Sequence, residues 1–138
     1  MTLSGRRTGP DERGASLSAF VAVVVVALLA MGGLAIDGGA QSAARRECQQ
    51  VATEAARAAS DAGALLRASG RAGDADEMRA AALAVLAAHP GLSGGVTVAA
   101  GQIRVEASRT VDTSFLSLVG IGTLRASGQA EAALEGTG

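Results

Sequence analysis

Residues 11–37 read DERGASLSAFVAVVVVALLAMGGLAID, and the part from Ala15 to Ile36 contains no charged side chain. At about 1.5 Å per residue, this part forms a helix of roughly 33 Å, long enough to cross a hydrocarbon core of about 30 Å. Its apolar residues are consecutive and would cover every face, whereas a core helix of a soluble domain is usually shorter and amphipathic. In lipid, a helix also satisfies its own backbone hydrogen bonds. The stretch therefore predicts a transmembrane helix over residues 15–36.

A cleaved secretory signal is the alternative to a permanent anchor. The apolar region of such a signal spans about 7–15 residues, which is shorter than this run, although small residues after Asp37 would suit a signal peptidase. We expect a permanent anchor. Arginines 6, 7 and 13 in the preceding segment predict a cytoplasmic tail over residues 1–14. Residues 37–138 then form an extracytoplasmic domain of a single-pass protein of the cell membrane.

Composition narrows the function classes. The chain has 138 residues, a formal net charge of −1, no Trp and no Tyr, so it offers neither a basic patch nor aromatic side chains that would stack nucleic-acid bases. Cys48 and His89 are its only cysteine and histidine, too few for a zinc site. We expect no enzyme activity, no cofactor, no metal, no nucleic-acid partner and no small-molecule substrate.

The helical pattern resumes beyond the span. From Ala40 to Ala68, small and apolar residues recur three and four positions apart, which places them on one helix face. This predicted stalk core face comprises Ala44, Cys48, Val51, Ala55 and Ala62, with Ala59 and Leu66 at the same spacing. Charged residues and glutamines occupy the other faces. The pattern predicts an amphipathic stalk helix that continues from the span and ends around Ser69-Gly70.

A second helix and a small sheet follow. Asp74, with Glu77 three residues later, has the spacing of a capping box and predicts a helix to about Ala88. Residues 92–95 are expected to form a loop. The period then changes to two, which predicts a hairpin of strands 96–100 and 103–107 and a third strand over 124–132. An apolar cluster around Phe115 predicts one helical turn. The expected fold class is α+β, with a three-stranded antiparallel sheet.

Three single residues and one acidic cluster could suggest binding or catalysis, but each is better explained by a structural role. Asp37 is expected to mark the outer edge of the span, because a charge deeper in lipid is costly. His89 is expected to contact carbonyl groups at a helix end. Cys48 is expected to be a small buried apolar residue, with an intermolecular disulfide as the alternative. The acidic cluster at residues 74–77 lacks a calcium-loop pattern, and a helix start explains it better.

Three segments carry a resemblance to a known family. They are Glu12-Arg13-Gly14 with Phe20 six residues later, Leu34-Ala35-Ile36-Asp37-Gly38-Gly39, and the Ala-rich segment 43–57. The order of elements resembles the type IV pilin plan, and these segments resemble the TadE/TadG-like proteins of Flp (tight-adherence) pilus assembly over about residues 11–65. The resemblance implies a structural, minor pilin-like component of a Flp-type pilus or related secretion apparatus. The alternative is a small exported or membrane-anchored binding protein unrelated to pili.

The resemblance also implies a processing site. Processed members of the family are cut after a glycine, which here is Gly14 and would leave Ala15 as the first residue. Such members have glutamate at the fifth position, where this chain has Ala19. TadG-like members often lack that glutamate, so both cleavage after Gly14 and an uncut chain stay open.

Small residues on the span predict an association surface. Ala15, Ala19 and Ala22 lie on one face, and small residues let helices approach closely in lipid. We expect this face to pack against a helix of a pilus or platform subunit. Genome composition is the alternative explanation for the alanines.

Overall fold

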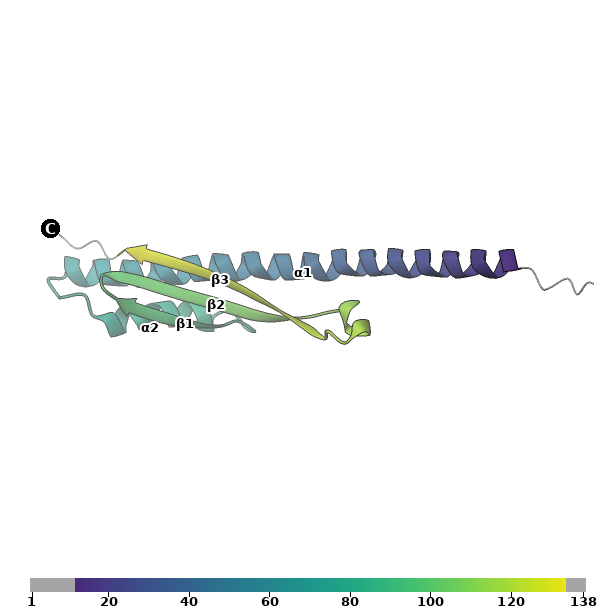
Figure 1. Ribbon diagram of the computed structural model, residues 1–138. Coiled ribbons are helices and arrows are strands. Elements are labelled where there is room, and N and C mark those ends of the chain that lie inside the picture. Colours follow the sequence, from purple (N-terminus) through teal and green to yellow (C-terminus); the bar gives the residue numbers. More distant parts are fainter. Residues whose placement is uncertain (1–11, 134–138) are drawn as a thin grey trace, which may run out of the picture.

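The computed structural model describes residues 12–133, with side chains from residue 16 onward. Two helices, three strands and one 3₁₀ turn follow one another along the chain (Figure 1). In order they are α1 (Glu12–Ala68), α2 (Ala75–Ala87), β1 (Ser93–Ala99), β2 (Gln102–Asp112), η1 (Leu116–Val119) and β3 (Thr123–Ala133). The predicted α+β class, with its long N-terminal helix, second helix and three-stranded antiparallel sheet, is confirmed. Most of the predicted tail, residues 1–11, lies outside the described residues.

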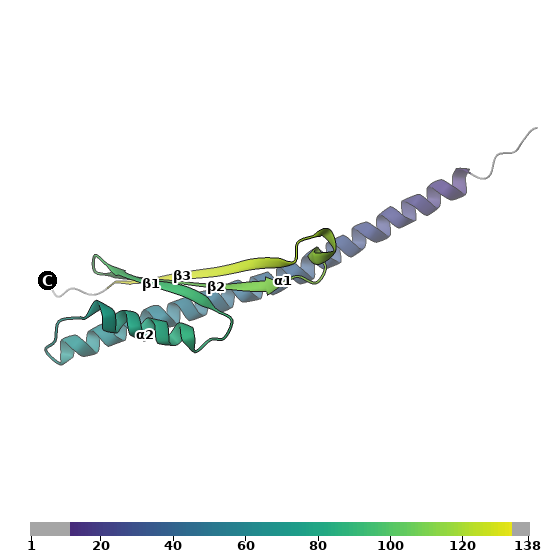
Figure 2. The same ribbon diagram turned by 90° about the horizontal axis from the view of Figure 1, so that it is seen from below.

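Helix α1 is a continuous rod of 57 residues. At about 1.5 Å per residue it is roughly 85 Å long, far longer than the rest of the domain. Its N-terminal half projects alone, and its C-terminal half carries α2 and the sheet (Figures 1 and 2). The same helix therefore provides both an unpartnered apolar segment and one layer of a folded domain.

The domain has two layers. Helices α1 and α2 form one layer, and the sheet packs on them, with β2 and β3 against α1 and β1 against α2. The core between the layers consists mostly of alanines from α1 together with Ile103 and Val105 of β2. Small side chains allow the layers to approach closely. At Gly128 of β3, an added Cβ would lie 2.5 Å from the Cα of Gln49, so only glycine fits there.

The sheet has the order β1-β2-β3 with both pairs antiparallel. A two-residue turn at Ala100-Gly101 joins β1 to β2, and both residues have positive φ values, 50° and 72°. This location agrees with the predicted hairpin. The expectation of a loop over 92–95 is wrong from Ser93 onward, because Ser93 pairs with Ser108 and starts β1. Gly94 and Gly95 have weak strand propensity, but β2 supplies the hydrogen-bonding partner.

Helix α2 begins as its sequence predicts. The Asp74 carboxylate accepts a hydrogen bond from the backbone N–H of Asp76 at 2.9 Å and caps the helix. Met78, Ala82 and Leu86 are buried against the core. At the other end, Nδ1 of His89 lies 3.0 Å from the carbonyl oxygen of Val85, which is the helix-end contact expected of this histidine.

Candidate functional site

The N-terminal half of α1, called the free half here, has an apolar surface that is almost entirely exposed. The helix contains the one candidate membrane span found among the described residues. Only 6% of its most apolar 18-residue stretch is buried. Large exposed side chains include Phe20, Leu28, Leu29, Met31 and Leu34. A core helix of a soluble protein would be mostly buried, so this surface requires lipid or another protein around it. One such helix indicates a membrane-anchored, single-pass protein.

Asp37 stands where this apolar segment ends. Its side chain is only 2% exposed, and its carboxylate accepts three backbone hydrogen bonds from the segment before and within η1. The N–H of Ser114 donates to Oδ1 at 2.8 Å. The N–H groups of Phe115 and Leu116 donate to Oδ2 at 3.0 and 2.7 Å. Because η1 has no cap of its own, Asp37 serves as its N-terminal cap from a different element.

These hydrogen bonds favour the ionised carboxylate. The N–H groups of Leu116 and Ser114 hold the pKa of Asp37 below its ordinary value, and that of Phe115 acts in the same direction. Burial alone would raise the pKa, but the hydrogen bonds outweigh it. Three N–H donors therefore compensate the negative charge of the buried Asp37 carboxylate, which reduces the cost of placing it at the edge of the apolar segment.

Gly33 completes the attachment of the η1 segment. It lies one helical turn before Asp37 on the same face of α1. A Cβ at Gly33 would stand 2.7 Å from Cγ of Phe115, so the absence of a side chain there admits the phenylalanine ring. Gly33 and Asp37 thus form a docking site on α1 for residues 113–122, which we call the η1 loop.

The η1 loop is closed by its own backbone. The N–H of Thr113 donates to the carbonyl oxygen of Gly122 at 3.0 Å, and the N–H of Ile121 donates to the carbonyl oxygen of Leu116 at 3.0 Å. The Thr113 hydroxyl donates to the Ile121 carbonyl, and the Ser117 hydroxyl donates to Ser114 at 2.8 Å. The loop consequently has a defined shape and presents Leu118 and Val119 outward, where both are exposed.

Sequence reasoning found Asp37 but not its partners. It placed the residue at the outer edge of the span, and the structure adds that the carboxylate binds a loop 77 to 79 positions away. An apolar cluster around Phe115 was visible in the sequence. Nothing in its spacing relates that cluster to Gly33, because the contact depends on how β2 and β3 lie along α1.

The predicted stalk core face lies toward the sheet. Four of its members are buried, and Ala62 is half-buried. Cys48 has no exposed surface, and burial raises the pKa of its thiol, with the neighbouring Glu47 carboxylate acting in the same direction. Its Sγ lies 3.8 Å from the carbonyl oxygen of Ala126. An intermolecular disulfide at Cys48 would require the domain to open.

The residues predicted for helix packing in the membrane and for cleavage lie on the N-terminal half of α1, apart from the folded domain. Ala19 and Ala22 are exposed on the free half of α1. Gly14 and Ala15 lie in the first turns of α1, and their side chains are outside the described part of the structure.

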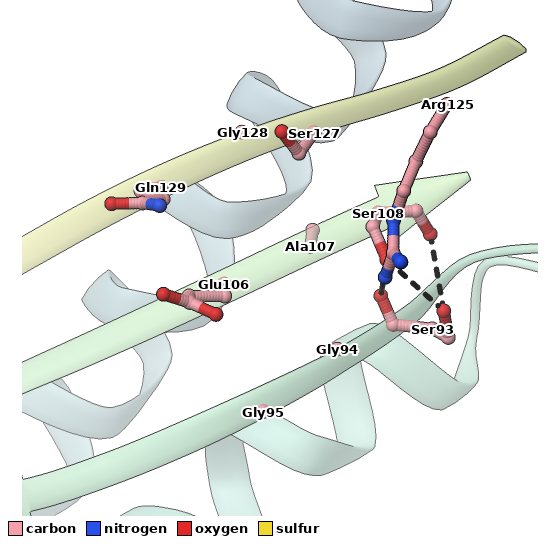
Figure 3. A pocket seen from close by; sticks show the side chains of 10 residues that line it. All are labelled: Ser93, Gly94, Gly95, Glu106, Ala107, Ser108, Arg125, Ser127, Gly128 and Gln129. Atoms are coloured by element: carbon pink, nitrogen blue, oxygen red, sulfur yellow. Dashed lines mark hydrogen bonds between the residues drawn. The ribbon is translucent and has the colours of Figure 1, made fainter. Parts of the chain in front are cut away.

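The outer face of the sheet is polar and contains a shallow groove. The groove has a volume of about 470 Å³ and crosses all three strands (Figure 3). Arg125 reaches from β3 to the Ser108 hydroxyl at 3.2 Å, and that hydroxyl lies 3.2 Å from the Ser93 hydroxyl. Nearby, Arg104 and Glu131 form a cross-strand ion pair at 2.7 Å. The polar groups of Arg125, Ser108 and Ser93 therefore bond to one another across the groove.

Histidine, cysteine, aspartate and glutamate side chains are the usual metal ligands in proteins. Among the described side chains, those of residues 16–133, no group of three or more His, Cys, Asp and Glu is placed to hold a metal ion. Three surfaces with functional potential are present: the free half of α1, the η1 loop beside it and the polar groove.

Comparison with known proteins gives one family match. Residues 14–65 match the family model described as "Putative Flp pilus-assembly TadE/G-like". The matched residues lie within α1 and extend from its free apolar half into the stalk. The match confirms the resemblance predicted from the sequence and supports involvement in Flp (tight-adherence) pilus assembly. No curated protein and no solved structure matches the chain.

Proposed function

We propose that this protein is a structural, minor pilin-like component of a Flp-type pilus or a related secretion apparatus in the bacterial envelope. The observation that carries the proposal is the coincidence of the family match with α1, which combines an exposed apolar half and a stalk that supports a small sheet. The protein acts by association with membrane and protein partners and not by catalysis. Its partners are other pilus or platform subunits.

The proposed topology has three segments. Residues 1–14 form a cytoplasmic tail or a leader that is removed after Gly14, residues 15–36 cross the membrane, and residues 37–138 form the extracytoplasmic domain. The arginines of the tail support this orientation. A reporter enzyme that is active only outside the cytoplasm should be active when fused after Gly138. Activity of a cytoplasmic reporter alone at that position would reverse the topology.

Deletion of the gene in the producing bacterium tests the function. Flp-type pili counted by electron microscopy should be lost or much reduced, and the wild-type chain should restore them. A chain whose residues 16–36 are replaced by a cleavable signal should not restore them, although its domain is exported. Unchanged piliation in the deletion strain would contradict the proposed function.

The groove on the sheet is the observation that favours the alternative, a small exported or membrane-anchored binding protein unrelated to pili. In that case the deletion strain keeps its pili, and substitutions in the groove alter binding of a ligand. The mutual hydrogen bonds of Arg125, Ser108 and Ser93 favour a structural role for these polar groups.

A further inference from the structure

We propose that the η1 loop is a second membrane-contacting element, which inserts apolar side chains into the lipid boundary at the Asp37 end of the span. The proposed occupant of this surface is the bilayer itself. The inference rests on the membrane anchoring in the proposed function and extends it to a part of the chain far from the span in sequence.

The first argument is the chemistry of the exposed surface. Leu118 is 82% exposed and Val119 is 73% exposed, and Ile121 adds further apolar surface. No charged residue occurs from residue 113 to residue 124. Apolar side chains gathered on one uncharged loop are expensive to hydrate and indicate an interaction surface.

The second argument is continuity with the span. Phe115 lies against Gly33, three residues before Ile36, the last residue of the uncharged run. At about 1.5 Å per residue, this contact is roughly 4.5 Å inside the end of that run. Apolar faces of interfacial elements reach about 5–10 Å into the boundary between headgroups and acyl chains. A bilayer around residues 15–36 therefore meets the η1 loop at interfacial depth, as the position of η1 beside α1 suggests (Figure 2).

The third argument is the state of the loop backbone. Exposed N–H and carbonyl groups oppose entry into lipid, since each unpaired group costs several kcal/mol. Asp37 accepts three N–H groups of the loop. Further amides donate within the loop, from Thr113, Leu118, Gly120 and Ile121. These hydrogen bonds lower the free-energy cost of moving the loop from water into the interfacial region of a bilayer.

Two contact points would fix the orientation of the domain. A single helix can rotate about its axis in the membrane, and its tilt depends on anchoring groups at the interface. Insertion of the η1 loop on one side of α1 would hold that side toward the bilayer. The polar groove on the sheet would then keep a fixed direction relative to the bilayer surface.

Tryptophan fluorescence tests the proposal with the full chain. The natural sequence has no Trp and no Tyr, so each introduced tryptophan is observed without background. The reporter variant is Leu118→Trp, at a site open enough to accept the larger ring. The matched controls are Leu28→Trp in the span and Gln102→Trp at the distant hairpin end of β2. Each is reconstituted into vesicles of phosphatidylcholine and phosphatidylglycerol with bromine atoms on the acyl chains.

We expect Leu118→Trp to lose most of its emission to bromines placed near the headgroups and less to bromines near the chain ends. Leu28→Trp should be quenched by deep bromines, and Gln102→Trp by neither. If Leu28→Trp is quenched and Leu118→Trp is open to soluble acrylamide, the inference is overturned while anchoring stands. Shielding of Leu118→Trp from both lipid bromines and acrylamide would indicate a protein partner and would also overturn it. Failure of quenching at Leu28 would remove the anchoring and the inference together.

Discussion

The side-chain amide of Gln49 on α1 pairs with the backbone of Gln129 on β3, donating to its carbonyl at 2.7 Å and accepting from its N–H at 3.2 Å. Eight residues earlier, Gln41 donates to the Arg125 carbonyl at 3.0 Å. Eight helical residues span about 12 Å and four strand residues about 13 Å, so helix and strand run in step. The stalk helix thereby occupies part of the edge of β3 that another strand could otherwise pair with.

The Gln49 pairing predicts a specific loss of stability. Gln49→Ala removes two hydrogen bonds, each worth about 0.5–1.5 kcal/mol, and should lower the free energy of unfolding by about 1 kcal/mol because the site is exposed. Gln50→Ala changes the adjacent, exposed glutamine and should cost less than about 0.5 kcal/mol. Chemical denaturation of the full chain in detergent measures both. Equal costs would mean that the pairing with β3 contributes nothing.

Attachment of the η1 loop should depend on Gly33 and not on Gly32. An added Cβ meets nothing within 4 Å at Gly32, but at Gly33 it collides with the ring of Phe115. Overpacking of this kind costs about 1–3 kcal/mol, so Gly33→Ala should detach the loop more often. Chymotrypsin, which cleaves after Phe and Leu, should cut the loop about fivefold faster or more in this variant, since each 1.4 kcal/mol changes an equilibrium about tenfold. Gly32→Ala is the control, and similar cleavage of both variants would show that the contact does not hold the loop.

The three hydrogen bonds from the η1 loop to the Asp37 carboxylate should weaken in acid. Hydrogen bonds lower the pKa of this carboxyl below its ordinary 3.8, so its ionised form stabilises the attachment at all pH values above that number. The stabilisation is lost as the pH falls from 3.8 through the lower folded-state pKa. Amide hydrogen exchange at Ser114, Phe115 and Leu116 should therefore show protection at neutral pH that disappears in acid.

The Asp37→Asn variant provides the comparison. Its neutral side chain cannot offer a charged acceptor to three donors, so protection of these amides should already be weak at neutral pH and should not vary with acid. Asp112→Asn removes an exposed carboxylate close to the loop and should behave like the wild type. Strong neutral-pH protection in Asp37→Asn would show that the carboxylate charge is dispensable.

Periodicity and length were sufficient to predict the elements of this fold. The uncharged run predicted the exposed apolar half of α1, three- and four-residue spacing predicted the stalk, and alternation predicted the strands around Val96 and Ile103. These signals are local, since each depends on residues within one element. They did not predict that β1 starts at Ser93. Gly94 and Gly95 have weak strand propensity, and this part of β1 depends on its pairing with β2.

The contacts that build the candidate site are not local, and this is why the sequence did not predict them. Gln49 and Gln129 are 80 positions apart, and Asp37 binds residues 77 to 79 positions away. Their pairing is determined by the lateral position of the sheet on α1. That position depends on close approach at Gly128, whose role in a strand of small residues has no distinctive pattern.

The core face of the stalk should be intolerant of charge. Val51 is 3% exposed between helix and sheet, and Val51→Asp would bury a carboxylate without a designed partner, which should cost more than about 3 kcal/mol. Arg57→Ala, on the exposed face, should stay within about 0.5 kcal/mol of the wild type. Thermal melts of the detergent-solubilised chain distinguish the two. Comparable melting temperatures would mean that the stalk does not form the core of the domain in solution.

Association in the membrane should depend on the small face of the span. Ala19 and Ala22 are exposed on α1, and the four-residue spacing from Ala15 to Ala19 predicts that the three alanines share a face. Close helix packing in lipid relies on small side chains, so Ala19→Leu should separate this face from a neighbouring helix. Val24→Leu enlarges a side chain about 140° away around the helix and should leave the contact intact, since each residue turns about 100°. Cross-linking in membranes of the producing bacterium, followed by co-purification of pilus and platform subunits, measures the effect. The small face is refuted if Ala19→Leu preserves every cross-link, or if Val24→Leu disrupts them equally.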